Sequence, residues 1–216
     1  MIKPATWKPI LKTATHLGAL TPLALMLLAL LTGNYGPNPI GEFTLRTGKT
    51  ALILLLLTLA CTPIAEVFQF RFVLRLRRPL GLYAYLYAAI HFAIFIGLDY
   101  GFLLGLIRTA LLEKRYALAG LAAGLLMTPL AITSTRGWIR RLGKRWKQLH
   151  RLAYAAGLLA VTHYLWLVKP GVPTPWLYAG VLLVLFLLRV KPIQSSMATL
   201  FERVRASIFS SEERTS

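Results

Sequence analysis

The amino-acid sequence predicts an all-α polytopic membrane protein, a bundle of six transmembrane helices that forms a single domain over residues 1–216. The chain is 56% hydrophobic and only 15% charged, and its mean hydropathy of +0.61 is not that of an ordinary water-soluble domain. A bilayer core about 30 Å thick requires roughly 20 helical residues to cross. The alternation typical of membrane β-strands is absent. Six apolar stretches come close to the required length, at about 13–32, 50–70, 80–98, 117–135, 149–168 and 172–189, and 193–216 is predicted to be a cytoplasmic tail.

The distribution of basic residues predicts the orientation of these spans. Lys and Arg number 19 on one side of the six spans and 6 on the other, and the most basic loop is 134–148. Because cytoplasmic loops of membrane proteins carry the excess of Lys and Arg, both termini are expected in the cytoplasm. Topology and attraction to anionic lipids account for the net charge of +18, so the charge does not indicate nucleic acid as a partner.

The first two spans carry few chemical groups. The span 13–32 follows three lysines and resembles a signal peptide, but it lacks a small-residue cleavage site and is expected to remain as a helix. The single cysteine, Cys61, lies within the second span, which excludes an internal disulfide and a cysteine-based metal cluster. Glu66, near the inner end of that span, is expected to pair with a nearby arginine, although it could also carry protons or bind a quinone head group.

The remaining segments show mainly packing signals. The apolar loop 101–116 is expected to lie along the outer surface as an interfacial helix. In the fourth span, Gly120 and Gly124 have the spacing of small residues at close helix contacts, which indicates packing rather than chemistry. The sixth span has no ionisable residue between its ends, and the tail is expected to form a short amphipathic helix with a disordered end.

Three histidines in apolar segments are the strongest indication of function. His91 lies in the middle of the third span, and His150 and His163 lie at the start and near the far end of the fifth. Ionisable residues at membrane depth usually face the bundle interior and serve a function. Both spans run outward, and at a rise of about 1.5 Å per residue His163 lies only a few ångströms beyond His91.

This shared depth predicts a haem site. Two histidines that approach from opposite sides of a gap between helices can take both axial positions of a haem iron, as in helix bundles that bind b-type haem. We therefore predict His91 and His163 as the axial pair. Zinc would require further ligands, and the sequence places no Cys, Asp, Glu or fourth His at that depth.

His150 needs a different partner. It precedes His163 by 13 residues and lies about 140° around an ideal helix from it. The positions 13 and 14 residues before His91 are Arg78 and Arg77, so His16 in the first span is the only remaining imidazole at a comparable depth. Basic side chains near the cytoplasmic face could neutralise haem propionates or the phosphate of a flavin nucleotide; they are Arg75, Arg77, Arg78, Lys144, Arg145 and Lys147.

These residues carry a family resemblance. The segment GKRWKQLH with a second histidine 13 residues on, the segment LGLYAYLYAAIH and the six-span layout together resemble the haem-binding subunits of bacterial periplasmic protein-methionine-sulfoxide reductase systems, within the ferric-reductase-like transmembrane superfamily. The resemblance covers essentially the whole chain. It implies an inner-membrane cytochrome b that takes electrons from the quinone pool or a cytoplasmic flavin reductase and passes them to a periplasmic molybdenum-dependent reductase that repairs oxidised methionines. It also implies haem ligation by His91, His150 and His163, and an association with FMN.

The chain also departs from the wider superfamily. The eukaryotic oxidases carry two histidines on each of two helices, whereas the third span here carries only His91. One haem is therefore expected, and a second depends on a further partner for His150. The sequence has no Gly-rich phosphate loop, so the electron donor must be external and the chain is expected to be an electron-transfer subunit rather than the methionine sulfoxide reductase itself. The alternatives are a self-sufficient ferric or quinone reductase of the same superfamily and a non-redox transporter or scaffold.

Overall fold

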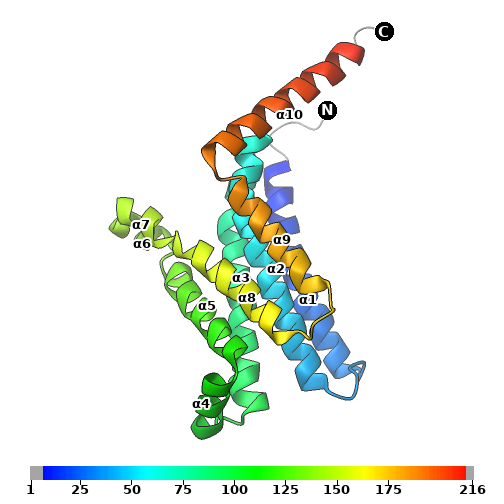
Figure 1. The fold of residues 1–216 in the computed structure, drawn as a ribbon, viewed down its shortest axis with the longest axis vertical. Helices are drawn as coiled ribbons and strands as arrows, with labels where there is room; N and C mark the ends of the chain where they lie inside the picture. The colour runs from blue at the N-terminus through cyan, green and yellow to red at the C-terminus, as the bar shows by residue number, and fades with distance from the viewer. Residues whose placement is uncertain (1–6, 213–216) are drawn as a thin grey trace.

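The computed structural model describes residues 7–212, and no strand is present among them (Figure 1). Lys3 and Arg214, which contribute to the predicted charge asymmetry, and the end of the predicted tail lie outside the described residues. The helices are α1 (Trp7–Leu31), α2 (Pro39–Val67), η1 (Arg71–Arg75), α3 (Arg77–Ile94), η2 (Phe95–Asp99), α4 (Leu104–Glu113), α5 (Arg115–Ile132), α6 (Arg136–Leu142), α7 (Lys144–Leu149), α8 (Leu152–Leu167), α9 (Thr174–Leu187) and α10 (Lys191–Glu212).

The predicted class of all-helical membrane protein is confirmed. Within the described residues, four segments are long and apolar enough to cross a bilayer: Pro9–Leu31, Pro39–Val67, Arg77–Asp99 and Arg115–Ile132. A fifth is added if α9 and the first part of α10, which bend by 91° at their junction, form one broken span. α8 has 16 residues, fewer than the roughly 20 that a full crossing requires, so the expected count of six spans stays a prediction.

α2 begins eleven residues earlier than the sequence predicts. The side chain of Asn38 accepts a hydrogen bond of 2.9 Å from the backbone N–H of Gly41, and Pro39 occupies the first turn. Both features stabilise a helix N-terminus. The segment before Thr50, expected in an outer loop, therefore forms the first three turns of α2 and brings new side chains into the bundle.

The basic segment 134–148 is folded into the short helices α6 and α7. Gly143 separates them with a φ of +51°, a backbone conformation that glycine adopts without steric cost. α7 ends at Leu149 with His150 as its C-cap, and α8 starts at Leu152. The predicted continuous span from residue 149 is therefore interrupted, and His150 lies in the turn before the helix that carries His163.

α2 and α3 pack against each other along their length, as do α5 and α8, and α2 also contacts α1, α8 and α9. The inner core contains Leu52 and Leu59 of α2, Val161 of α8 and Leu182 of α9. Large apolar side chains remain exposed on the outer helices, including Leu31 at 85% and Trp176 at 70% of their surface. In a helical membrane protein such side chains contact lipid.

Two buried polar contacts tie the outer helices to this core. The hydroxyl of Tyr87 in α3 donates to the carbonyl of Ala19 at 2.7 Å and accepts from the N–H of Leu23 at 2.9 Å, both in α1. The Arg189 guanidinium, at the end of α9, donates to the Tyr154 hydroxyl of α8 and to the Leu59 carbonyl of α2, each at 2.6 Å. Buried polar groups paired in this way stabilise the arrangement of the helices.

Candidate functional site

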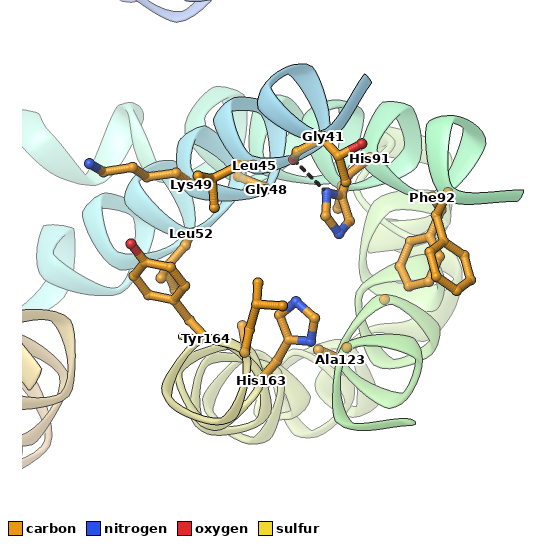
Figure 2. A pocket seen from close by; sticks show the side chains of 18 of the residues that line it. Gly41, Leu45, Gly48, Lys49, Leu52, His91, Phe92, Ala123, His163 and Tyr164 are labelled. Atoms are coloured by element: carbon orange, nitrogen blue, oxygen red, sulfur yellow. Dashed lines mark hydrogen bonds between the residues drawn. The ribbon is translucent and has the colours of Figure 1, made fainter. Parts of the chain in front are cut away.

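His91 of α3 and His163 of α8 face each other across a cavity in the bundle (Figure 2). Their ring centroids are 6.1 Å apart and the ring planes make an angle of 84°. The cavity has a volume of about 580 Å³ and its walls come from α2, α3, α5 and α8. Cofactor and small-molecule sites usually measure about 300–1,000 Å³.

A backbone carbonyl fixes the orientation of each imidazole. Nδ1 of His91 lies 2.9 Å from the carbonyl oxygen of Thr44, and Nδ1 of His163 lies 2.6 Å from that of Tyr116. A carbonyl oxygen only accepts hydrogen bonds, so both Nδ1 atoms must carry the proton. Each Nε2 then has a free lone pair, which is the arrangement found in metal-bound histidines with an oriented second nitrogen.

The separation of the two rings matches a shared metal ion. A metal–imidazole bond is about 2 Å long, and Nε2 lies about 1.1 Å from the centre of its ring, so two axial imidazoles on one ion place their centroids about 6 Å apart. The observed 6.1 Å agrees with this value. The pair can therefore bind one iron atom between them with no large displacement of α3 or α8.

Two glycines make room for the histidine rings. A Cβ atom on Gly48 of α2 would lie 3.0 Å from both Cε1 and Nδ1 of His91, and one on Gly120 of α5 would lie 2.7 Å from Nδ1 of His163. Gly120 therefore does more than bring helices together, the only role that its spacing with Gly124 predicts. Gly124 packs against the ring of Phe92, where a Cβ would lie 2.4 Å from Cε2.

Most of the cavity wall is apolar, which suits a porphyrin. Of the described residues that line it, Lys49 is the only Lys or Arg, and Glu42 and Asp99 are the only acids. Glu42 already pairs with Arg46, with 3.2 Å between Oε2 and Nη2. Among the described side chains, no group of three or more His, Cys, Asp or Glu is placed so that it could hold a metal ion.

His150 lines a separate cavity of about 340 Å³, together with Arg77, Arg78 and Trp146. Its Nε2 lies 3.2 Å from the hydroxyl of Thr133, which itself donates to the Pro129 carbonyl at 2.6 Å. The hydroxyl proton is thus engaged, and His150 must donate through Nε2. This leaves Nδ1 as its free nitrogen, unlike the free Nε2 atoms of His91 and His163.

The structure places His16 apart from His150. Nδ1 of His16 lies 2.8 Å from the Tyr83 hydroxyl, and the ring lines a third cavity, of about 460 Å³, with Lys12, Arg75 and Arg78. None of the three cavities is lined by both imidazoles, so the predicted partnership has no support in the described residues. Of the basic residues predicted near the cytoplasmic face, Arg75 and Arg78 line the cavity beside His16, and Arg77 and Arg78 line the one beside His150. Lys144, Arg145 and Lys147 line none of the three cavities.

Several residues of the site were not predicted, yet a signal for some of them is present in the sequence. Thr44 precedes His91 by 47 residues, and Tyr116 precedes His163 by the same interval. Four residues after each lies a glycine that contacts the corresponding histidine, Gly48 or Gly120. A comparison of the sequence with itself, shifted by the interval between His91 and His163, would have matched Gly48 with Gly120 as well as the two histidines.

Comparison with known proteins places these residues in a family context. Residues 47–161, which include His91 and His150, match the family model described as "Ferric reductase like transmembrane component". A protein of Xanthomonas axonopodis pv. citri (strain 306) is 44% identical over 196 residues, covering 88% of this chain and 90% of the relative. A protein of Rhodospirillum rubrum is 42% identical over 182 residues, covering 84% and 88%. Both relatives are named "Protein-methionine-sulfoxide reductase heme-binding subunit MsrQ". No solved structure matches the chain.

Proposed function

The chain belongs to the ferric reductase like transmembrane family and, within it, to the heme-binding subunits named MsrQ, and on that premise we propose that it is a membrane electron-transfer subunit with b-type haem bound by His91 and His163. The observation that carries the proposal is the pair of free Nε2 atoms facing one cavity at a spacing that suits one iron atom. The haem supplies one-electron chemistry when bound, and the chain orients its ligands and excludes water.

The relatives' name supports a place in a methionine sulfoxide reductase system. We propose that electrons come from the quinone pool or a cytoplasmic flavin reductase, with FMN at that step. They pass to a periplasmic molybdenum-containing methionine sulfoxide reductase that repairs oxidised proteins. The chain is then not itself the methionine sulfoxide reductase. It lies in the bacterial inner membrane with six spans and both termini in the cytoplasm, α8 and α9 being the fifth and sixth spans.

A second haem would use the cavity beside His150. Arg77 and Arg78 line that cavity and could neutralise carboxylates, and the indole of Trp146 stacks on the imidazole with 3.9 Å between ring centroids. His150 would then ligate through Nδ1, or through Nε2 after releasing Thr133. In the described part of the chain, no second imidazole lines this cavity, so the other axial position would be taken by a different group or stay open.

An absorption spectrum of the purified protein tests the proposal. We expect a Soret band and sharp α and β bands after dithionite reduction, as for iron with two axial histidines. Titration of haem per polypeptide then separates one bound group from two. A colourless protein from cells with full haem supply would refute the proposal and favour a transporter or scaffold whose histidines relay protons or only pack.

The rival within the family is a self-sufficient ferric or quinone reductase that acts on a small acceptor at the outer face. Membranes reduced with dithionite can be mixed anaerobically with a periplasmic molybdoprotein, Fe³⁺ chelate or a soluble quinone. Fast haem reoxidation by the molybdoprotein alone is expected. Equally fast reoxidation by a small acceptor would support the rival.

A further inference from the structure

Lys49 is a cation in an unusual place. It lies ten residues after Pro39, and at 1.5 Å per residue this is about 15 Å into α2. α2 has 29 residues and is about 43 Å long, more than a hydrocarbon core of about 30 Å, so Lys49 lies near the Pro39 end of the membrane-crossing part of the helix and its side chain is exposed. Its neighbour Gly48 contacts the ring of His91, so Lys49 is next to the residue that seats a proposed axial ligand.

The ammonium group of Lys49 has no partner among the described residues: they offer it no hydrogen bond, ion pair or ring contact. Arg46, one turn earlier, is by contrast paired with Glu42. Lys49 is the one Lys or Arg among the described residues that line the cavity between the two histidines. A cation in this position can therefore bind an anionic group of whatever occupies the cavity.

Tyr164 offers a second polar group at the same side of the cavity. It follows His163 directly in α8, and its ring packs against Tyr178 with 5.8 Å between centroids. Within the described part of the chain, side chains 9–203 included, its hydroxyl has no hydrogen-bond partner. Figure 2 shows Lys49 and Tyr164 on one side of the cavity, with their polar ends directed away from the histidine pair, and Phe92 on the opposite side.

We propose that the Lys49 ammonium and the Tyr164 hydroxyl bind a propionate carboxylate of the haem held by His91 and His163, and so select one in-plane orientation of the macrocycle. The inference rests on the proposed function. Haem carries its two carboxylates at one edge and apolar substituents elsewhere, which matches the two sides of this cavity. A charge-assisted hydrogen bond is stronger than a neutral one.

The six basic residues predicted near the cytoplasmic face do not line this cavity, so Lys49 supplies the positive charge among the described residues that line it. Of the two acids that line the cavity, Glu42 is paired with Arg46.

The test compares haemin with haemin dimethyl ester, in which the carboxylates are uncharged. Haem-free protein from haem-limited cells is purified in detergent and titrated with each compound, as wild type and as Lys49→Met, Lys49→Arg and Tyr164→Phe. Arg108→Met in α4 is the control, because it removes an exposed positive charge that lines none of the three cavities. Melting temperatures of the haem-free variants show whether each one is folded.

We expect wild type and Arg108→Met to bind haemin about tenfold or more tightly than the ester. Lys49→Met should lose most of this preference and keep at most the part that Tyr164 contributes, while Lys49→Arg restores most of it. Tyr164→Phe should lower the preference for haemin over the ester by a smaller factor, about threefold to fivefold. The midpoint potential of the haem should fall in Lys49→Met, since an uncompensated carboxylate stabilises the ferric state, and esterification should abolish that fall.

If folded Lys49→Met keeps the full preference for haemin, the inference is wrong, whereas the proposal that His91 and His163 bind haem is unaffected. If Lys49→Met does not fold, Tyr164→Phe and Lys49→Arg decide: unchanged preference in Tyr164→Phe together with lost preference in Lys49→Arg contradicts the proposed pair. Failure of the wild type to bind either compound would instead refute the proposed function. The two failures are therefore distinguishable.

Discussion

Replacing Gly120 by alanine should displace a haem ligand without removing it. The added Cβ would lie 2.7 Å from Nδ1 and 3.0 Å from Cε1 of His163, closer than real Cβ contacts allow. The ring cannot simply slide away, because its Nδ1 donates to the Tyr116 carbonyl at 2.6 Å. Either this hydrogen bond breaks or α5 and α8 move apart. Overpacking of this kind costs about 1–3 kcal/mol.

The expected result is haem binding weakened about fivefold to 150-fold, which is that cost expressed as an affinity ratio. Haem-free protein is titrated with haemin, and the low-spin α band reports whether both axial ligands are in place. Gly48→Ala should weaken binding less, because the nearest atoms of His91 would be 3.0 Å away.

Gly180→Ala is the matched control. It lies in α9, where an added Cβ would have no atom within 4 Å, and alanine stabilises a helix interior relative to glycine by about 0.5–1 kcal/mol. Wild-type affinity is therefore expected for it. Undiminished haem affinity and an unchanged α band in Gly120→Ala would refute the idea that this glycine seats the ligand. Equal losses in Gly120→Ala and Gly180→Ala would show a general effect of altered helices.

Three further outcomes are expected. His91→Ala and His163→Ala should each abolish the haem signal of the cavity between them, whereas His150→Ala should leave part of the absorbance; equal and complete loss in all three would contradict the pairing. Arg189→Ala leaves the Leu59 carbonyl without its donor and should lower the free energy of unfolding by about 2 kcal/mol, seen as a lower melting temperature in detergent; an unchanged melting temperature would contradict this. Haem-free wild type should melt below the haem-loaded protein, and this difference should vanish in His91→Ala; a difference that persists in the variant would place the bound haem elsewhere.

The sequence predicts the class of protein and its central histidine pair for a simple reason. Both depend on quantities that a linear chain encodes, namely the length of apolar stretches and the rise of a helix per residue. Counting from the cytoplasmic ends placed His91 and His163 at similar depths, and in the structure their rings lie 6.1 Å apart. No contact between segments had to be known for that inference.

The start of α2 could not be found in the same way. Arg46 and Lys49 are charged, and charge near the end of an apolar stretch is typical of a loop. In the structure Arg46 pairs with Glu42 one turn away, and Lys49 lines an internal cavity. Arg46 is thus stabilised by a neighbour in its own helix, whereas the position of Lys49 beside the cavity depends on the packing of α2 against α3 and α8.

His150 shows a second limit of predictions that assume ideal helix geometry. Its predicted direction assumed one continuous helix from residue 149, but the chain turns at His150 before α8 begins at Leu152. The free nitrogen of its ring is then set by the hydroxyl of Thr133, which follows α5. Neither the turn nor this cross-helix contact has a signature in the local sequence.

The contacts around each histidine explain how two imidazoles on separate helices can be oriented to bind one metal ion. Each imidazole is held by a carbonyl and a glycine of the helix packed against its own, α2 for His91 and α5 for His163. The two helix pairs thus orient the ligands before any cofactor binds. Haem binding then loses little conformational entropy from ordering either ring. This preorganisation raises the affinity for haem at a given set of contacts. It follows that mutations at the glycines, which supply no ligand to the iron, should weaken binding by disturbing this preorganisation.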